Sequence, residues 1–582
     1  MFRESSPQSP LWQPVIAFPG ILPLDDWSYI FKNKIYPLID ENDFKHLYHD
    51  TIGAPNKPIK LQVSLLLFMA IEKLNWREAE FQFARRIDWM NATYTPFGEA
   101  DIDHTTLFKF FQKLENDDAA YKIFQKLTAN FIVECSVSMS KQRVDSFFMD
   151  GWLERLSRYG LLKETNRSFL QNLRKQKPGL YEEIKKELSR DYLYKSFDLT
   201  EKDKAIASRK IIEMANDMHH IKSAFENHKQ IKNYKTFEIL SKVFEQQCVV
   251  KTIKDEKGKD RQNIEIREKP KGTHIISTPH NPDAQYTKKR KQTVVGHKGF
   301  VTETCDPENE VQFITDVNLE KAGHSDSVEI SLIEQRLEDN NLKPKKLYGD
   351  AGFVNGKSIL ESKEKDIDLE GPSSGRSQSF EEYNKEDRPF DIADFGVEVE
   401  EDTKEIKIIS CPNKQSALEQ SRSKKTGKII VHFDVERCKE CEQKARCPVK
   451  IGVRVATLTV NEEQYAGAVR HQEYMGNSDY RRECGIRAGA EGLVNEIANG
   501  HGARKARHRS KEGPKLQLVL AALGCNIKRY IRYVKKCGLN SEKARRYGLC
   551  LLENSFFTLK KCLKRIFYQN ICNFPKFFGS HI

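Results

Sequence analysis

The sequence predicts an α/β fold in which helices precede and interrupt a sheet. In residues 291–350, QTVVGHKGFVTETC and EVQFITDVN read as paired strands, SVEISLIEQRLEDN as a helix, and KKLYGD as a strand that ends at an acid. This order is typical of an α/β layer. The Leu-rich run 61–74, LQVSLLLFMAIEKL, predicts a buried helix ahead of that layer.

Length and composition narrow the class of protein. A chain of 582 residues exceeds what one hydrophobic core usually supports, so two or more folding units are expected. The formal charge of +13 suits a polyanionic partner, and also an ordinary solvated enzyme surface. Thirteen cysteines without a secretory signal predict reduced thiols and a cytoplasmic protein. The apolar run Leu65–Ile71 is too short to span a membrane, so no membrane association is expected.

Composition changes along the chain predict its organisation. Residues 1–140 are expected to form a helical N-terminal domain, and residues 141–535 the α/β domain. A highly charged stretch at about 155–270 predicts a helical insertion, because it is almost free of Pro and Gly. A second insertion is expected at about 365–475, acidic at first and then β-rich with cysteines. Residues 536–582 form a basic and aromatic tail.

Three acids stand in contexts that suit metal-dependent phosphodiester chemistry. Asp145 lies on an apolar strand (RVDSFFM), Asp350 closes the strand KKLYGD, and Glu491 lies beside an apolar helical stripe. Such chemistry needs carboxylates from separate elements to converge on two divalent ions. Taken singly, each acid is better explained as a chance Asp at a strand edge or a Glu on a solvated helix face, and only the conjunction of context and order favours the catalytic role. The stripe consists of Ile486, Ala490, Leu493, Val494 and Ile497.

Two rival acids stand close to this set. Asp150 is five residues from Asp145 and points to the opposite strand face, while Glu496 is rotated by about 140° from Glu491 on a helix. The side chain of Asp150 therefore does not point the same way as that of Asp145, and the side chain of Glu496 does not point the same way as that of Glu491. Asp150 is the first reserve for the catalytic role.

Three sequence blocks resemble the catalytic blocks of DDE-type insertion-sequence transposases. They are Val-Asp-Ser at 144–146, Leu-Tyr-Gly-Asp-Ala-Gly-Phe at 347–353, and Arg-Ala-Gly-Ala-Glu at 487–491 followed by the basic segment 501–507. Residues 278–306 resemble the stretch that these proteins place before the second acid, and the Leu-rich region 61–114 resembles their N-terminal helical domain. The resemblance covers most of residues 55–535.

The resemblance implies an RNase H-like core with a mixed sheet, the first acid on its first strand, the second on its fourth and the glutamate on a later helix. It implies that Asp145, Asp350 and Glu491 hold two Mg²⁺ or Mn²⁺ ions, cut transposon ends and join the freed 3′ hydroxyl to target DNA. Many members carry Tyr-x2-Arg-x3-Glu-x6-Lys around the glutamate. This chain keeps Arg487 but has Cys484 and Ala498 at the Tyr and Lys positions.

A basic run directly follows the Glu491 helix and is expected to bind DNA phosphates, because guanidinium groups make bidentate phosphate contacts. Three of its residues are candidates to replace the missing lysine of the signature: Arg504, Lys505 and Arg507. The alternative is a solvated helix end. A second basic patch lies at residues 288–291. The expected DNA-binding residues are Arg487, Arg504, Lys505, Arg507 and Arg509.

Four cysteines in the second insertion have spacing that suits a structural zinc site. Cys438 and Cys441 form a C-x2-C pair, and Cys411 and Cys447 are expected to supply the other half. The alternative is a set of buried or free thiols.

The leading functional prediction is a transposase that acts on transposon ends and target DNA. The alternatives are an RNase H-like nuclease, a catalytically silent DNA-binding descendant of a transposase, and a structural nucleic-acid-binding protein whose acids are incidental. Pairing of two transposon ends predicts a homodimer by analogy.

Overall fold

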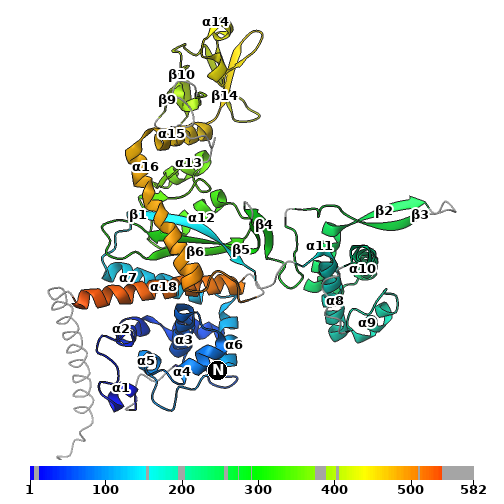
Figure 1. Ribbon diagram of the computed structural model, residues 1–582, viewed down its shortest axis with the longest axis vertical. Coiled ribbons are helices and arrows are strands. Elements are labelled where there is room, and N and C mark those ends of the chain that lie inside the picture. The colour runs from blue at the N-terminus through cyan, green and yellow to red at the C-terminus, as the bar shows by residue number, and fades with distance from the viewer. Residues whose placement is uncertain are drawn as a thin grey trace, which may run out of the picture.

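The computed structural model describes residues 1–4, 12–151, 156–194, 203–254, 260–272, 274–289, 292–373, 388–400, 405–508 and 512–539. It has a central sheet with helices below it, a β-rich lobe above it and a helical lobe to one side (Figure 1). The basic and aromatic tail expected at 536–582 lies outside the described residues from residue 540 onward. Among the described segments, no helix combines the length and apolar character that a membrane span needs.

The central sheet is mixed. Strand β5 (Gln292–Thr304) pairs antiparallel with β1 (Lys141–Asp150) on one side, and with β4 (Gln285–Lys289) and β6 (Ile314–Lys321) on the other. Strands β7 (Lys346–Tyr348) and β8 (Asp368–Glu370) continue the sheet from β1 in parallel. The order β6-β5-β1-β7-β8 is that of an RNase H-like core, so the expected fold class is confirmed.

Helices α12 (Asp326–Asp339) and α13 (Gly356–Glu364) connect the parallel strands, as βαβ crossovers require. A later helical segment contains α15 (Glu462–Gly476), α16 (Ser478–Cys484) and α17 (Gly489–Asn495). The 3₁₀ turn η7 (Gly485–Ala488) precedes α17 and the π-helical turn η8 (Glu496–Gly500) follows it. Helix α15 begins at Glu462, inside the stretch to about 475 that the sequence analysis assigned to the β-rich second insertion.

The N-terminal region is helical, as expected. The Leu-rich run forms α3 (Ile59–Glu72), on which ten side chains are buried. The long helix α18 (Glu512–Leu539) packs on α3, α7 and β6, between the N-terminal helices and the sheet (Figure 1). Buried residues of the N-terminal helices, the sheet and α18 therefore form one continuous core. The other N-terminal elements are α1 (Pro14–Ala17), α2 (Trp27–Ile30), η1 (Phe31–Ile35), η2 (Tyr36–Leu38), η3 (Glu41–Leu47), α4 (Trp76–Phe83), α5 (Ile87–Ala92), α6 (His104–Leu114) and α7 (Ala119–Glu134).

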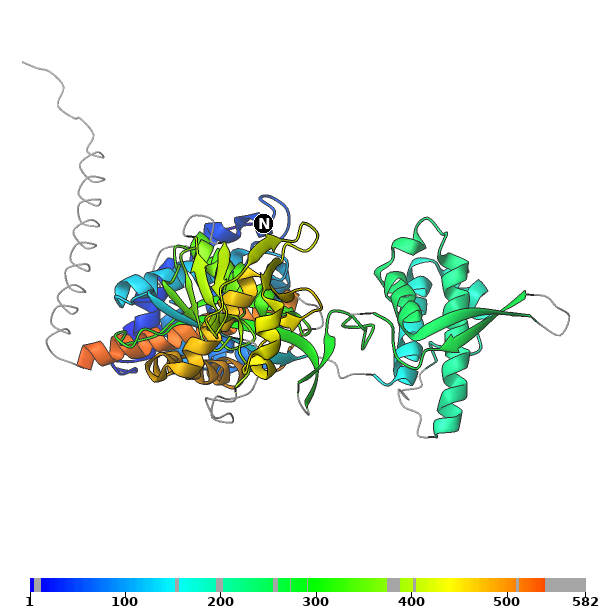
Figure 2. The same ribbon diagram turned by 90° about the horizontal axis from the view of Figure 1, so that it is seen from above.

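The helical lobe has a core of its own. It lies beside the sheet, and its two-stranded arm points away from the rest of the molecule (Figure 2). Its chain leaves at the end of β1 and returns just before β4, where Leu156 N donates to Ser277 O at 3.3 Å. The lobe consists of α8 (Arg158–Gln176), α9 (Pro178–Lys185), α10 (Lys204–Phe225), η4 (Ile231–Asn233), α11 (Lys235–Gln247), β2 (Cys248–Lys254) and β3 (Asp260–Ile266).

The Cys-containing lobe between β8 and α15 also has a separate small core. Its four-stranded antiparallel sheet has the order β11-β12-β14-β13, and β9 and β10 form a separate pair. Its elements are η5 (Ile392–Asp394), β9 (Gly396–Val399), β10 (Ile406–Ser410), β11 (Glu419–Arg422), β12 (Ile429–Phe433), α14 (Val435–Glu440), η6 (Lys444–Arg446), β13 (Lys450–Ile451) and β14 (Ala456–Val460).

Candidate functional site

The register of the sheet brings the first two predicted acids to the same level of adjacent strands. Lys141, Gln142 and Arg143 of β1 pair in parallel with Lys346, Leu347 and Tyr348 of β7. Strand β7 ends at Tyr348, and continuing the same offset by two residues would bring Asp145 level with Asp350. Both acids are partly exposed. Neighbouring strands lie about 4.8 Å apart, so the register leaves the two acids as candidates for one local site.

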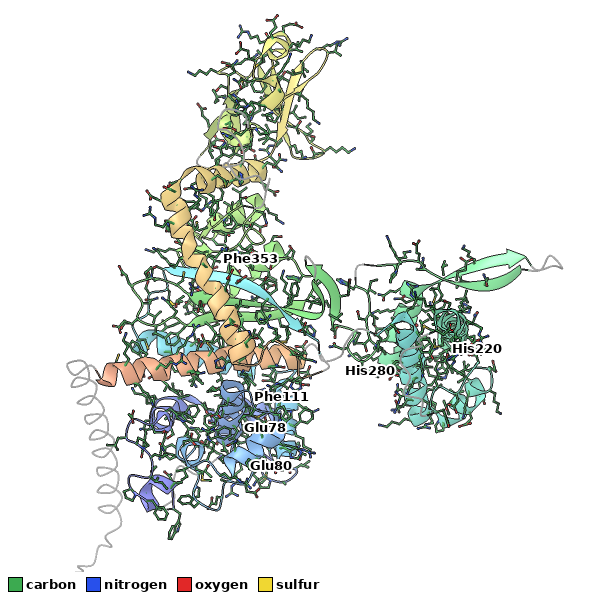
Figure 3. The ribbon with its side chains drawn as sticks, in the orientation of Figure 1. Glu78, Glu80, Phe111, His220, His280 and Phe353 are labelled. Carbon is green, nitrogen blue, oxygen red and sulfur yellow. The ribbon has the colours of Figure 1, made fainter. Side chains whose placement is uncertain are left out.

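The turn after β7 holds Asp350 at the strand end. Its Oδ1 accepts a hydrogen bond from Gly352 N at 2.8 Å. The buried ring of Phe353, labelled above the sheet in Figure 3, anchors the turn and packs edge-on against Phe300, with ring centroids 6.2 Å apart. The absence of a side chain at Gly352 leaves room for two acids, because a Cβ there would lie 2.9 Å from oxygens of both Asp350 and Asp326.

Asp326 was not among the acids singled out from the sequence. It is the first residue of α12, and Lys298 Nζ on β5 lies 2.7 Å from its Oδ1. This pairing neutralises Asp326. An acid in the first turn of a helix is common and carries little functional signal, and only the fold shows that Asp326 lies next to Asp350.

Glu491 lies on α17, which packs against β1. Ala490, Leu493 and Ile497 are buried, as the apolar stripe predicted, and Glu491 itself is exposed. Helix α17 therefore lies beside the strand that carries Asp145. The three predicted acids come from elements that all adjoin β1, but they are not among the described groups of three or more potential ligands whose atoms all lie within 4.8 Å of one another.

The reserve acid Asp150 lies at the end of β1, five residues beyond Asp145. Its backbone is engaged by the basic run: its N–H donates to Arg504 O at 2.9 Å, and its carbonyl accepts from Ala506 N at 2.7 Å. These bonds place Lys505 in a parallel bridge with Asp150. The basic run therefore continues the edge of the sheet beyond the acids.

Arg504 and Lys505 have exposed side chains. Ala498, at the signature's Lys position, is buried, and its carbonyl accepts a hydrogen bond from Arg504 N at 3.0 Å. Position 498 is therefore unable to offer a cation at the surface. The backbone of Arg504 is hydrogen-bonded to this position, and the Arg504 side chain is exposed. Arg487 is partly exposed on η7, close to Glu491 in the chain.

Arg507 is engaged by the protein itself. Its guanidinium donates to Leu74 O at 2.8 Å and to Lys73 O at 3.0 Å, just beyond the end of α3. This side chain therefore links the basic run to the N-terminal helices. Arg509 lies outside the described residues, and so do the side chains of the patch at 288–291.

The four predicted zinc ligands line one small cavity, with an accessible volume of about 30 Å³. All four are partly exposed free thiols. Burial, and then the proximity of Cys411, Cys447 and Cys441, raises the pKa of Cys438 to about 11. A tetrahedral zinc would require sulfurs about 3.8 Å apart. The four thiols are not among the described groups whose ligand atoms all lie within 4.8 Å of one another, so they are farther apart than the ligands of a formed zinc site.

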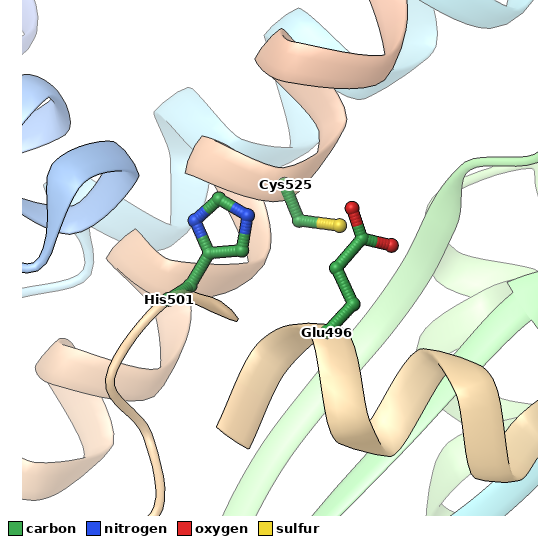
Figure 4. A group of neighbouring side chains, drawn as sticks. All are labelled: Glu496, His501 and Cys525. Carbon is green, nitrogen blue, oxygen red and sulfur yellow. The ribbon is translucent and has the colours of Figure 1, made fainter. Parts of the chain in front are cut away.

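A different group of potential ligands lies closer together: Glu496, His501 and Cys525 (Figure 4). Burial raises the Glu496 pKa, but the charge and hydrogen bonds of Arg529 outweigh it and hold that pKa below its usual value. Burial also raises the pKa of Cys525 to about 12 and lowers that of His501 to about 4. The carboxylate is thus paired with an arginine, and burial favours the neutral thiol and the neutral imidazole, although His501 Nε2 is buried without a hydrogen-bond partner among the described residues.

Comparison with protein families gives two matches. Residues 410–531 match the family described as "Transposase DDE domain", a range that includes the four cysteines, Glu491 and the basic run. Residues 24–113 match "Transposase domain (DUF772)", which covers the helices from α2 to α6. A comparison with curated proteins and one with solved structures gave no match.

Proposed function

Because the chain belongs to the DDE-type insertion-sequence transposases, we propose that it cuts DNA at transposon ends and joins the freed 3′ ends to target DNA. The observation that most supports this proposal is the parallel pairing of β1 with β7, because continuing it by two residues would bring Asp145 level with Asp350. Helix α17, which carries Glu491, packs on the same strand β1.

The donor set fits a pair of hard divalent cations. Asp145, Asp350 and Glu491 offer carboxylate oxygens, the ligands that Mg²⁺ and Mn²⁺ prefer. Lys298 Nζ lies 2.7 Å from Asp326 Oδ1 and offsets the charge of Asp326, which is therefore not one of the proposed ligands. When bound, two such ions activate the attacking oxygen and stabilise the leaving oxygen of the phosphodiester.

The basic run supplies the DNA-binding part of the proposal. Arg504 and Lys505 are exposed and fixed by backbone hydrogen bonds to the end of β1. Cations held there bind the phosphates that flank the scissile bond, and partly exposed Arg487 adds a cation on the Glu491 side. Replacing Arg504 and Lys505 with Ala should make the dependence of log affinity on log salt shallower, by about 0.9 for each phosphate that the variant no longer neutralises.

The central experiment compares Asp350→Asn with Asp368→Asn. Asp368 is an exposed aspartate on the neighbouring strand, paired with the opposite end of β7, and so is a matched control. DNA fragments carrying the inverted repeats that flank the coding region serve as substrate, with Mg²⁺. Asp350→Asn should abolish cleavage and leave DNA binding nearly unchanged, because it keeps the side-chain shape and removes the charge. Asp368→Asn should cut like the parent.

Cleavage that persists in Asp350→Asn would reject the assignment and make Asp150 the next acid to replace. The same substrates separate the alternatives. A nuclease would cut labelled ends without joining them to a second DNA, and a silent descendant would bind the ends without cutting them.

Two transposon ends must be held together for joining, so the proposal includes a homodimer on DNA. Light scattering of the protein with paired end fragments should give the mass of two chains. A complex with one chain per two ends would reject the dimer.

A further inference from the structure

Four charged side chains form a continuous series of ion pairs behind the proposed metal site. Glu303 on β5 is almost fully buried and lies opposite Arg143 of β1 in the sheet register. Its Oε1 accepts hydrogen bonds from Arg143 Nε at 2.8 Å and Nη2 at 2.6 Å, and its Oε2 accepts from Arg529 Nη1 at 2.7 Å. Arg529 Nη2 donates onward to Glu496 at 2.7 Å. Glu303 thus bridges the two arginines, and Glu496 is the last member of the series.

Both arginines hold the helical segment that carries Glu491. Arg143 Nη1 donates to Ile486 O at 2.8 Å, five residues before Glu491. Arg529 binds the Glu496 side chain, five residues after it. Between these contacts, α17 is only seven residues long and joins a 3₁₀ turn to a π-helical turn. Its position along the sheet is therefore set by the contacts at its two ends.

Gly489 provides the space that the Arg143 contact needs. A Cβ at this position would lie 1.9 Å from Arg143 Nη1. Its φ of −62° is ordinary helix, so backbone conformation does not require glycine here. The guanidinium fills the volume that a side chain would occupy.

We propose that Arg143, Glu303, Arg529 and Glu496 form a positioning clamp that sets Glu491 against Asp145 and Asp350. The inference rests on the proposed function. Arg143 lies two residues before Asp145 on the same strand face, so the clamp ties the helix of the third acid to the strand of the first. The four charges balance two to two, and breaking one link leaves a poorly compensated buried charge.

Gly489→Ala tests the clamp, with Gly485→Ala as the matched control. Gly485 has the same helical conformation, with φ −58°, and a Cβ there meets open space. Mn²⁺ binding to the full chain is measured by electron paramagnetic resonance of the free ion. Gly489→Ala should weaken Mn²⁺ affinity by about tenfold or more, the usual effect of disturbing a group that orients a metal ligand. Gly485→Ala should change it less than twofold.

A second variant and a second readout complete the test. Arg143→Lys keeps the charge but cannot reach both Glu303 and Ile486 O, so it should weaken Mn²⁺ binding in the same direction. Hydrogen exchange of residues 485–500 should rise in Gly489→Ala and Arg143→Lys and stay at the parent level in Gly485→Ala.

The outcomes separate the clamp from the function on which it rests. If Asp350→Asn abolishes Mn²⁺ binding while both glycine variants and Arg143→Lys bind like the parent, the clamp is overturned and the proposed function stands. Faster exchange with unchanged Mn²⁺ affinity would reduce the four residues to a structural role and overturn the clamp. Mn²⁺ binding that survives Asp350→Asn would overturn the proposed function and the role of Glu491 together.

Discussion

His508 follows the basic run and is buried among aromatic rings of the N-terminal helices. Its imidazole stacks on Phe111 with ring centroids 4.3 Å apart, and Trp76 lies edge-on at 6.2 Å. Burial, and then the nearby charge of Arg507, lowers the pKa of His508 to about 4, although Glu115 lies only 3.8 Å away. The ring is therefore neutral in the folded protein at pH 7.

This burial predicts a loss of stability in acid. Below pH 6.5 the unfolded chain protonates His508 and the folded chain does not, so stability falls as pH drops from 6.5 towards 4. At pH 5 the loss from this residue is about 2 kcal/mol. His508→Phe keeps the stack and removes the titration. Thermal midpoints at pH 7 and pH 5 should therefore differ less in the variant than in the parent. Equal shifts in both proteins would contradict the prediction.

Sequence reasoning predicted the three acids from their contexts, their order and the family resemblance, but it did not single out the residues of the proposed clamp. Arg143 and Glu303 are 160 residues apart in the chain, and Glu303 and Arg529 are 226 apart. No spacing rule relates partners so distant. The register of β1 with β5 creates the first pair, and the packing of α18 creates the second. A charged residue in an otherwise apolar strand is the signal that points to such a partner.

At the scale of an element, Arg507 completes the C-terminal end of α3. Lys73 there has a left-handed backbone with φ 60°, and the carbonyls of Lys73 and Leu74 face the Arg507 guanidinium. Arg507→Ala should therefore lower the free energy of unfolding by about 1 kcal/mol, because it removes charge-assisted hydrogen bonds. Arg504→Ala should leave the thermal midpoint unchanged. If the two variants have equal midpoints, Arg507 is not a structural link.

The Cys-containing lobe supports a second prediction at this scale. We propose that Cys411, Cys438, Cys441 and Cys447 hold one structural zinc, since they line one cavity. Protein purified without chelator should carry one equivalent of zinc by atomic absorption, and Cys438→Ser should carry far less. Cys305→Ser, at a buried cysteine of the central sheet, should retain the parent's zinc. Zinc-free parent protein would favour the alternative of free thiols.

Helix α15 shows why one element boundary was misplaced. None of its side chains is fully buried, so its sequence lacks the apolar period from which helices are recognised. A local signal was present, because Asn461 and Gln464 form a capping box at its start. In contrast, α3 and α12 were predicted within a few residues from dense or periodic apolar positions. Helices that bury apolar side chains were therefore predicted from the sequence, whereas α15, which buries none fully, was not recognised.

At the scale of the whole molecule, the two insertions leave the central sheet intact. The helical lobe interrupts the chain between β1 and β4, yet Gly151 N donates to Val295 O at 2.7 Å just beyond β1. The N-terminal helices differ from both insertions, since they share one core with the sheet through α18. The sequence predicted a separate N-terminal domain because helical and α/β patterns look distinct along the chain. Whether the apolar faces of the N-terminal helices and of the sheet pack against each other depends on tertiary structure, which these local patterns do not show.

The helical lobe should fold when separated from the rest of the chain. Its ends meet at the hydrogen bond between Leu156 and Ser277, and its core is separate from that of the sheet. A fragment spanning residues 156–277 therefore keeps its own core on excision, and its length is ordinary for an independent domain. The purified fragment should show a cooperative thermal transition by circular dichroism. Phe169 lies fully buried between Phe225 and Phe237, so Phe169→Ala should lower the midpoint strongly, at a cost of about 3–5 kcal/mol. A fragment that melts without cooperativity, or a midpoint indifferent to Phe169→Ala, would show that the sheet is needed to fold the lobe.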